Sequence, residues 1–364
     1  MTPRTPTSPE PGALDGLGFE RFRAAFVELE AVGLEPGRVV RTIRGHIWVA
    51  TESGVMRVSP TGNLMSGGEP GSFPVVGDWV GVRPATETSS AMVEALLPRA
   101  TCFMRRDPGK AAIAQVLAAN VDVVFIVDGL DRGPNLRRIE RELALAWESG
   151  ARPVIVLSKS DLADDPTGAV VAVSTIAPGV DVVLESAETG EGLEELRVYA
   201  SGNRTVALIG PSGVGKSTLT NGLAGGDLQS VGAVRAFDGK GRHTTVTREL
   251  VPLPGGGALL DTPGLRAFAM WDDEDGVDTT FSEISGLAAG CRFDDCSHET
   301  EPGCAVRAAL DAGSLDPARY DAFIALRRES EFHSLESDAR ARELKKRGKT
   351  IAKAIKDYHK HEGR

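Results

Sequence analysis

Residues 205–218 read TVALIGPSGVGKST: an apolar run, a glycine-rich turn and the start of a helical pattern. The spacing from Gly210 to Ser217 is that of the Walker A loop, whose backbone N–H groups surround phosphate oxygens at a helix N-terminus. In such a loop Lys216 reaches the β- and γ-phosphates, and the Ser217 hydroxyl ligates Mg²⁺. The loop alone does not choose between ATP and GTP. The predicted phosphate-binding residues are Gly210, Pro211, Ser212, Gly213, Val214, Gly215, Lys216, Ser217 and Thr218.

A candidate base-reading motif, SKSD, follows the apolar run PVIVL. It therefore lies at the carboxyl end of a strand, where open α/β sheets bind ligands. The Asp161 carboxylate can accept from both N1–H and the N2 amino group of guanine, a pair of donors that adenine lacks. By itself the motif could also be a surface loop. We expect the base to be bound by Ser158, Lys159, Ser160 and Asp161, with Lys159 along its plane.

Two further stretches favour GTP. ESAETGEG places Ser186 and Ala187 where their backbone could contact guanine O6. DTPG follows the short apolar run GALL, so that Asp261 could hold Mg²⁺ through water and the Gly264 N–H could touch the γ-phosphate. Together with the phosphate loop, these motifs predict a guanine nucleotide site.

The stretch GKGRHTT lies between the phosphate loop and DTPG, where the first switch segment of a GTPase belongs. Thr244 or Thr245 could ligate Mg²⁺, and we assign Thr245. His243 could orient or deprotonate the attacking water, and the alternative is a loop histidine that faces RNA or is structural. Many GTPases place a glutamine where this chain has Leu265, which can neither donate nor accept, so another group must position the water. The predicted catalytic residues are His243, Lys216 and Thr245.

The motifs run in an unusual order, because the base reader precedes the phosphate loop. This order predicts a circularly permuted P-loop GTPase domain, in which the chain enters the same sheet after the segment that normally follows DTPG. From Asn120 to Asp261 apolar runs alternate with helical stretches, which predicts an α/β fold with a parallel sheet. Short β-type runs before it suit an OB-like barrel. The predicted domains are a disordered tail (the first 16 residues) and short helix at 1–35, the barrel at 36–105, the GTPase domain at 106–280 and a zinc-binding domain with a basic helical tail at 281–364.

A cysteine and histidine cluster, C-x₄-C-x-H-x₅-C, lies near the C-terminus. Three thiolates and one imidazole at this spacing suit tetrahedral Zn²⁺, and a complete ligand set suits a structural site with one ion per chain. A disulfide is the alternative, which a reducing compartment disfavours. Cys102 is left over and is expected to be a small buried side chain. The predicted zinc ligands are Cys291, Cys296, His298 and Cys304.

Charge is distributed unevenly along the chain of 364 residues, whose net charge is −10. The last 25 residues, from Arg340, hold ten Lys or Arg and three acidic residues, so this tail is +7 and the rest is −17. A basic stripe recurs at helical spacing through Lys345, Lys349, Lys353, Lys356 and Lys360. It suits contact with RNA backbone, although a solvated helix would look the same. Apolar runs fall short of a membrane span and the N-terminus lacks a signal-peptide pattern, so the cytoplasm is expected.

The permuted order, the preceding barrel and the cysteine cluster resemble one family, the small-ribosomal-subunit biogenesis GTPases of the RsgA (YjeQ) type. Matching landmarks are VVGDWV, NVD, GPSGVGKSTLTN, GRHTT, DTPG and CRFDDCSHETEPGCAV. The resemblance implies a GTPase that binds rRNA and the small ribosomal subunit late in its maturation, and we expect a monomer. Ser158 departs from the usual asparagine and is expected to remove an amide that bridges base and phosphate loop. A nucleotide-sensing RNA-binding module with negligible turnover is the alternative, and a P-loop ATPase or kinase is disfavoured by SKSD and ESA.

Overall fold

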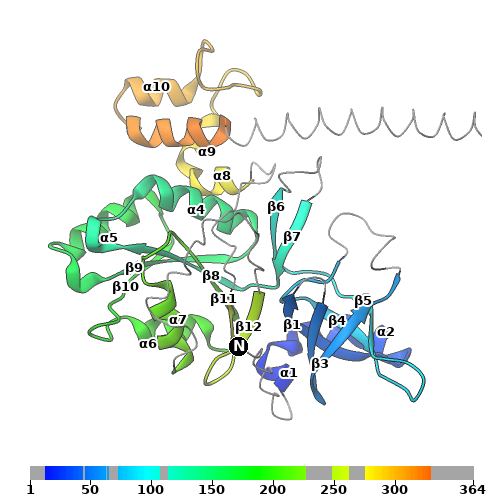
Figure 1. Ribbon diagram of the computed structural model, residues 1–364. Helices are drawn as coiled ribbons and strands as arrows, with labels where there is room; N and C mark the ends of the chain where they lie inside the picture. Colours follow the sequence, from blue (N-terminus) through cyan, green and yellow to red (C-terminus); the bar gives the residue numbers. More distant parts are fainter. Residues whose placement is uncertain are drawn as a thin grey trace, which may run out of the picture. The chain divides into compact units, whose positions relative to one another are not determined.

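The structure is a computed structural model that describes residues 13–43, 46–62, 64, 73–106, 114–226, 248–261 and 275–328 (Figure 1). The chain divides into two compact units. The first unit comprises Met1–Phe103 and Val116–Phe268, and the second comprises Met104–Gln115 and Ala269–Arg364. The domain limits expected from the sequence are finer than this division and stay predictions.

The predicted parallel sheet is confirmed in the first unit. Its strands occur in the order β10-β9-β8-β11-β13-β12, and all neighbours pair in parallel except β12 and β13. Every position of β8 is buried, as expected for a central strand of a sheet covered on both faces. The strands are β8 (Val123–Gly129), β9 (Arg152–Ser158), β10 (Asp181–Leu184), β11 (Thr205–Ile209), β12 (Arg248–Pro252) and β13 (Ala258–Asp261).

Helices cover this sheet on both faces (Figure 1). Because alternate residues of a strand point to opposite faces, β8 contributes to two cores. Val124 and Ile126 pack with α4 (Leu136–Glu148) and α5 (Pro166–Ile176). The other face of β8 packs Val123, Phe125 and Val127 with α6 (Leu193–Ala200) and α7 (Lys216–Ala224).

The N-terminal part of the first unit is a five-stranded barrel. Strands pair in the order β1-β2-β3-β5-β4, and β4 closes the barrel by pairing with β1. Seven side chains fill it: Val39, Ile47, Val49, Val58, Val80, Val82 and Val93. The strands are β1 (Glu35–Ile43), β2 (His46–Thr51), β3 (Gly54–Pro60), β4 (Trp79–Arg83) and β5 (Met92–Leu96).

Short helices precede the barrel, and one of them corrects the sequence expectation. We predicted a disordered tail through residue 16, but α1 (Ala13–Gly16) is a helical turn whose Leu14 is fully buried. The predicted amphipathic helix is present as the 3₁₀ turn η1 (Phe19–Phe22) and α2 (Arg23–Ala31). Phe19 and Phe22 contact the ring of Trp79, so this segment is held by aromatic packing against the barrel.

The barrel and the α/β part share one sheet, because β1 also pairs with β12. The register places Arg41 opposite Glu249 and Thr42 opposite Arg248. A bulge between Val39 and Arg41 interrupts the pairing of β1 with β2. Bulges bend a strand and increase its twist, which suits a strand that belongs both to the barrel and to the α/β sheet. A separate two-stranded sheet is formed by β6 (Cys102–Arg106) and β7 (Ala114–Ala119).

The part of the second unit that the structure describes contains the short helices α8 (Asp275–Thr280), α9 (Ser282–Ala288) and α10 (Ala305–Asp311), and a further helical stretch at 317–328. Phe281 is fully buried against Phe323, with ring centroids 5.6 Å apart. The Arg319 guanidinium lies over the Phe281 ring and donates to Thr280 O at 2.6 Å. Among the described residues of the whole chain, helices are too short or too polar to span a bilayer.

Candidate nucleotide site and metal cluster

The predicted nucleotide-binding segments converge on one edge of the sheet. The base-reading motif follows β9, the ESA stretch follows β10 and the phosphate loop follows β11. These strands and β8 run parallel, so their carboxyl ends meet at the same edge. Asp261 is the last residue of β13, which also runs parallel to β11. The sheet therefore gathers the motifs even though they occur in permuted order along the chain.

The phosphate loop has a backbone that only glycine accommodates. Gly210 has φ of 134°, and a Cβ there would lie 2.2 Å from the carbonyl oxygen of Val127 on β8. Gly215, with φ of 97°, is the residue from which α7 begins. Lys216 turns back over the loop, where its Nζ donates to Gly210 O at 2.7 Å and to Pro211 O. The loop and the first turn of α7 thus present backbone N–H groups to one side, as phosphate binding requires.

The base-reading motif is held by neighbouring carboxylates and hydroxyls. Lys159 adopts a left-handed backbone, with φ of 59°, and its Nζ lies 3.2 Å from Asp131 Oδ1. Asp161 is exposed, and its Oδ1 accepts from the Ser186 hydroxyl at 2.6 Å. The Ser160 hydroxyl donates to Glu191 Oε2 at 2.8 Å. The motif therefore keeps an accessible carboxylate in a fixed orientation.

Asp131 is a site residue that the sequence analysis missed. It lies in the 3₁₀ turn η2 (Leu130–Arg132), directly after β8. Because β8 and β9 are parallel neighbours, residues that follow each of them meet at the same edge. The sequence does show an acidic residue directly after an apolar run. Its proximity to the base-reading motif becomes apparent only when β8 and β9 are known to be neighbours.

The Ser158 side chain contacts the phosphate loop. Its hydroxyl donates to the carbonyl oxygen of Val214 in the phosphate loop at 2.5 Å, with Asp128 O at 3.3 Å. The hydroxyl therefore ties the base-reading strand to the phosphate loop, since it is a donor placed against a backbone carbonyl. The expected loss of an amide that bridges base and phosphate loop concerns the bound base and stays a prediction.

Of the two backbone amides predicted to contact guanine O6, one is already hydrogen-bonded within the protein. The Ser186 N–H donates to Glu191 O at 3.2 Å, whereas Ala187 is exposed. Glu185, just before them, is buried, and its burial together with the nearby Asp161 raises the pKa of its carboxyl to about 7. Around neutral pH this position is therefore close to half protonated.

A second acidic group with a raised pKa, the partly buried Glu142, lies on α4. Burial raises the pKa of Glu142 to about 7, against the opposing charge of Arg138. Arg138 pairs with Asp128 at the end of β8, and Asp128 Oδ2 also accepts from the Asn135 N–H at 2.8 Å. This cluster fixes the start of α4 next to the strand that precedes it.

Several predicted residues lie outside the described part of the chain. They are His243, Thr244, Thr245, Gly264 and Leu265. Asp261 is described only through its backbone in β13. Their assignments therefore stay predictions from the sequence.

The four predicted metal ligands meet in the second unit. Their ligand atoms all lie within 4.8 Å of one another. His298 Nδ1 is 3.5 Å from the sulfurs of Cys291 and Cys304, which are 3.9 Å apart. Ligands placed tetrahedrally around Zn²⁺ would be about 3.8 Å apart for two sulfurs and about 3.5 Å for sulfur and nitrogen. The cluster of Cys291, Cys296, His298 and Cys304 could thus hold a metal ion, and Cys102 is not among its members.

Neighbouring groups fix these ligands. Cys304 caps α10, and its sulfur accepts from the Arg307 N–H at 3.4 Å, while the Ala305 N–H donates to the Cys291 sulfur at 3.4 Å. His298 has a left-handed backbone, with φ of 66°, and burial lowers the pKa of its imidazole. A neutral imidazole is the form that binds metals.

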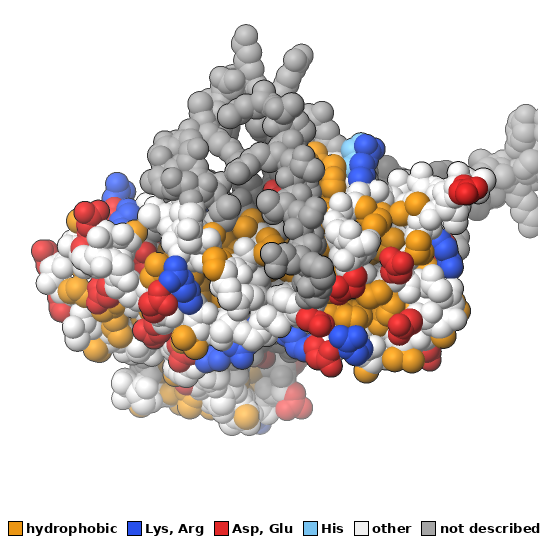
Figure 2. All heavy atoms as spheres, turned by 90° about the horizontal axis from the view of Figure 1, so that it is seen from below, with side chains coloured by type: hydrophobic (Ala, Val, Ile, Leu, Met, Phe, Trp, Pro, Cys, Tyr) orange, Lys and Arg blue, Asp and Glu red, His pale blue; other side chains and the backbone are white. Residues whose placement is uncertain are grey.

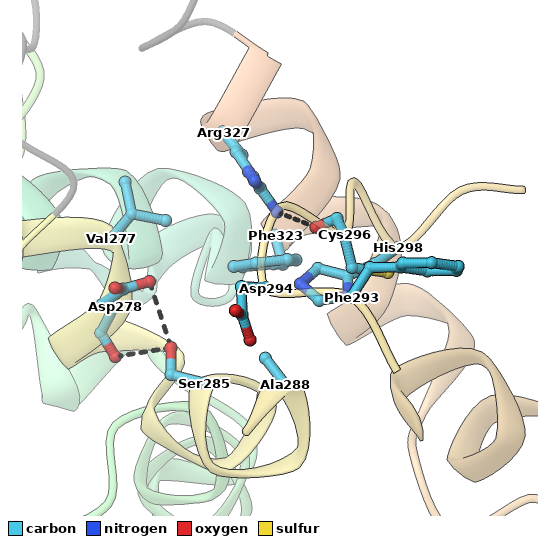
Figure 3. A pocket seen from close by; sticks show the side chains of 10 residues that line it. All are labelled: Val277, Asp278, Ser285, Ala288, Phe293, Asp294, Cys296, His298, Phe323 and Arg327. Carbon is cyan, nitrogen blue, oxygen red and sulfur yellow. Dashed lines mark hydrogen bonds between the residues drawn. The ribbon is translucent and has the colours of Figure 1, made fainter. Parts of the chain in front are cut away.

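A pocket of about 190 Å³ lies beside this cluster (Figure 3). Cys296 and His298 belong to its wall, and Arg327 donates to the Cys296 carbonyl oxygen at 3.3 Å. Opposite, the Ser285 hydroxyl contacts Asp278 O and Oδ1. All of the lining residues belong to the second unit, so the pocket is not formed by the nucleotide-binding motifs.

Comparison with known proteins connects both sites to one family. Residues 96–271 match the family model described as RsgA GTPase. A "Small ribosomal subunit biogenesis GTPase RsgA" of Streptomyces coelicolor is 48% identical over 351 residues, covering 94% of each chain. One from Opitutus terrae is 45% identical and covers 96% of this chain and 99% of its own.

Solved structures agree with this. YjeQ from Thermotoga maritima is 27% identical, with a TM-score of 0.61 over 82% of this chain and 98% of its own. YloQ, described as a circularly permuted GTPase, has a TM-score of 0.58 and shares the fold at 23% identity. The predicted architecture, a permuted P-loop domain after a small barrel and before a Cys₃His cluster, is confirmed. The chain belongs to the RsgA GTPase family.

Proposed function

We propose that this protein hydrolyses GTP to GDP and phosphate, and that it binds the small ribosomal subunit and its rRNA during subunit maturation. The observation that carries the GTPase proposal is the meeting of three loops at one sheet edge. There the exposed Asp161 carboxylate is held by Ser186, and Ser158 ties the base-reading strand to the phosphate loop. The names of the relatives support the ribosomal role.

Roles in the site follow from this geometry. Asp161 accepts from N1–H and the N2 amino group of guanine, and Ala187 N–H donates to O6 because the Ser186 amide is engaged with Glu191. Lys159 lies along the base, positioned by Asp131. Ser160 supports the motif through Glu191. The phosphate loop binds the triphosphate, with Lys216 leaving the loop carbonyls for the β- and γ-phosphates.

The bound nucleotide would bring Mg²⁺, which neutralises charge on the phosphates. Ser217 and Thr245 would ligate the ion, and Asp261 would hold it through water. Gly264 N–H would contact the γ-phosphate, and His243 would orient the attacking water. These assignments rest on the sequence motifs and on the position of Asp261 at the end of β13.

The Cys₃His cluster is proposed as a structural Zn²⁺ site with one ion per chain. The distances from His298 Nδ1 to two sulfurs and between those sulfurs support tetrahedral zinc. All four positions are protein ligands, so the ion would stabilise the fold of the second unit and would not bind substrate.

RNA binding is proposed for the barrel and the basic tail. Closed five-stranded barrels of the OB type bind oligonucleotides on the face of their second and third strands. On the face of the molecule shown in Figure 2, described acidic and basic side chains are interspersed without a continuous basic field. The concentrated positive charge is in residues 340–364, which the structure does not describe. We propose a monomeric, cytoplasmic protein, as expected for a factor that binds one subunit.

Guanine specificity is tested by Asp161→Asn. The amide keeps the shape of the side chain but places a donor against a guanine donor, which should weaken GDP binding by roughly 5- to 150-fold, as expected for a buried mismatch of about 1–3 kcal/mol. Dissociation constants for GDP and ADP measure this, with Asp164→Asn as an exposed control in the same loop. A variant that binds GDP as tightly as the parent would contradict the base-reading role of Asp161.

Turnover is tested by phosphate release from GTP against the concentration of small ribosomal subunits. We expect a slow intrinsic rate that rises with subunit concentration to saturation, and no rise with large subunits. Lys216→Ala should abolish both rates, because the ammonium on the transferred phosphate is lost. A rate that stays negligible with saturating small subunits, while GTP still binds, would favour the nucleotide-sensing RNA-binding module.

A further inference from the structure

The serine of the base-reading motif is fully engaged with the protein. Ser158 is 1% exposed, and its Oγ lies 2.5 Å from Val214 O and 3.3 Å from Asp128 O. Both partners are carbonyl oxygens, which only accept. A serine hydroxyl has one proton, and the shorter contact, to the phosphate loop, takes it. The hydroxyl therefore has no proton left to donate to a bound base.

The nearest basic side chain in this motif is also engaged. The Lys159 ammonium is directed to Asp131, 3.2 Å away. Ser158 lies beside the loop, since a Cβ on Gly215 would be at ordinary van der Waals distance, 3.8 Å, from both Cβ and Oγ of Ser158. This part of the site is a packed junction between β9 and the phosphate loop.

Guanine carries four polar groups on its Watson–Crick and Hoogsteen edges. N1–H and the N2 amino group are donors, and O6 and N7 are acceptors. In the proposed site Asp161 accepts from the two donors and Ala187 N–H donates to O6. N7 would need a further donor. A carboxamide at position 158 has two N–H hydrogens, so it could donate one to Val214 O and one to N7. A hydroxyl cannot do both.

We propose that Ser158 leaves N7 of guanine unread in this protein. The side chain keeps the base-reading strand attached to the phosphate loop, and guanine is recognised through N1–H, the N2 amino group and O6. The ligands that this site accepts then include guanine nucleotides altered at position 7. The inference rests on the proposed guanine site.

The test compares GDP, 7-deaza-GDP and ADP by calorimetry on the full chain, as the parent and as Ser158→Asn and Ser158→Ala. In 7-deaza-GDP a C–H group replaces N7. For the parent we expect equal affinity for GDP and 7-deaza-GDP. For Ser158→Asn we expect 7-deaza-GDP to bind roughly 2- to 12-fold more weakly than GDP, the value of one neutral hydrogen bond. Ser158→Ala should bind both nucleotides more weakly than the parent does, and equally, because only the bridge to Val214 is removed.

Three results would be decisive against the proposal. If the parent binds 7-deaza-GDP more weakly than GDP by a factor above about three, the parent contacts N7. The same discrimination in Ser158→Ala would place the reader elsewhere. A folded Ser158→Asn variant that binds GDP tightly and shows no discrimination would mean that a carboxamide here cannot reach the base. If this variant does not fold, the parent and Ser158→Ala decide. A parent that binds ADP as tightly as GDP would instead refute the proposed guanine site.

Discussion

Glu185 is a buried carboxyl group next to Asp161, the proposed guanine-reading carboxylate. Its side chain is 4% exposed, and burial, aided by Asp161, raises its pKa from 4.5 to about 7. Between about pH 4.5 and pH 7, Glu185 is protonated in the folded chain and ionised in the unfolded chain. The free energy of unfolding therefore falls as pH rises through this window, by up to about 3 kcal/mol.

Glu185→Gln removes this ionisation and should change the pH dependence of stability. Relative to the parent, the variant should gain stability between pH 5 and pH 8, because its amide stays neutral where the parent must charge a buried group. Melting temperatures at both pH values measure the gain. Glu188→Gln, an exposed position in the same turn, is the matched control and should show no such trend. A parent and a Glu185→Gln variant whose difference is the same at both pH values would show that Glu185 titrates normally.

At the scale of elements, one side chain joins the barrel, the N-terminal helices and the α/β sheet. Arg38 of β1 is 1% exposed, and its guanidinium lies over the Trp79 ring, 5.1 Å from the centroid. Burial lowers its pKa to about 10, so it stays charged at neutral pH. Its donors bind Leu17 O, Gly77 O, Asn120 O and Thr205 Oγ1.

Arg38→Met keeps the length of the side chain but removes the donor from those acceptors, of which Gly77 O still accepts from Asn120 Nδ2 at 3.0 Å. Each unsatisfied partner costs about 1–3 kcal/mol, so we expect stability to fall by at least about 3 kcal/mol. Urea unfolding measures it, and Arg57→Met, an exposed arginine on β3, should change stability by less than about 0.5 kcal/mol. Equal midpoints for the two variants would mean that Arg38 does not hold these elements together.

We expect the fold around the metal cluster to depend on the proposed ion. We expect one Zn²⁺ per chain, absent from Cys291→Ser and retained in Cys102→Ser, because only the first removes a thiolate from the cluster. Elemental analysis of purified protein measures both. The cluster includes Cys304, which caps α10, so removal of the ion should also destabilise this helix. Equal depletion of zinc in both variants would bring Cys102 into the site.

Local motifs were predictable from sequence, whereas contacts between them were not. The Walker spacing specifies the loop from Gly210 to Ser217 because phosphate binding there uses consecutive backbone amides. By contrast, the Lys159–Asp131 pair and the Ser158–Val214 bond depend on which strands are neighbours. The pairing of β1 with β12 was not predictable either, since edge strands carry no sequence mark of their partner. The burial of Leu14 was not predictable, because a single apolar residue in the expected tail gives no periodic pattern that would indicate a helix.

At the scale of the whole molecule, the permutation leaves the site unchanged because the sheet defines it. Ligand-binding residues follow parallel strands, and parallel strands end at one edge whatever their order in the chain. What the permutation changes is which segments flank the site. The barrel strand β1 pairs with β12, the strand that follows the segment containing His243 and Thr245. A change in that segment on nucleotide binding would therefore have a direct backbone connection to the barrel.

The uneven charge of the chain leads to a prediction for subunit binding. Residues 340–364 carry +7 on a molecule whose remainder carries −17, so we expect long-range attraction to rRNA to come from this end. Each phosphate that a basic side chain neutralises releases condensed counterions, and the logarithm of the binding constant then falls linearly with that of salt concentration. Removing residues 340–364 should weaken binding of small subunits at low salt and flatten this slope by roughly 0.7–0.9 for every phosphate that the tail neutralises. Sedimentation with subunits at several salt concentrations measures both, and GDP affinity serves as the control because the nucleotide site is formed by other residues. A truncated protein with the parent's slope would mean that the tail is a solvated helix and that the rRNA phosphates are bound by the barrel or the metal-cluster unit.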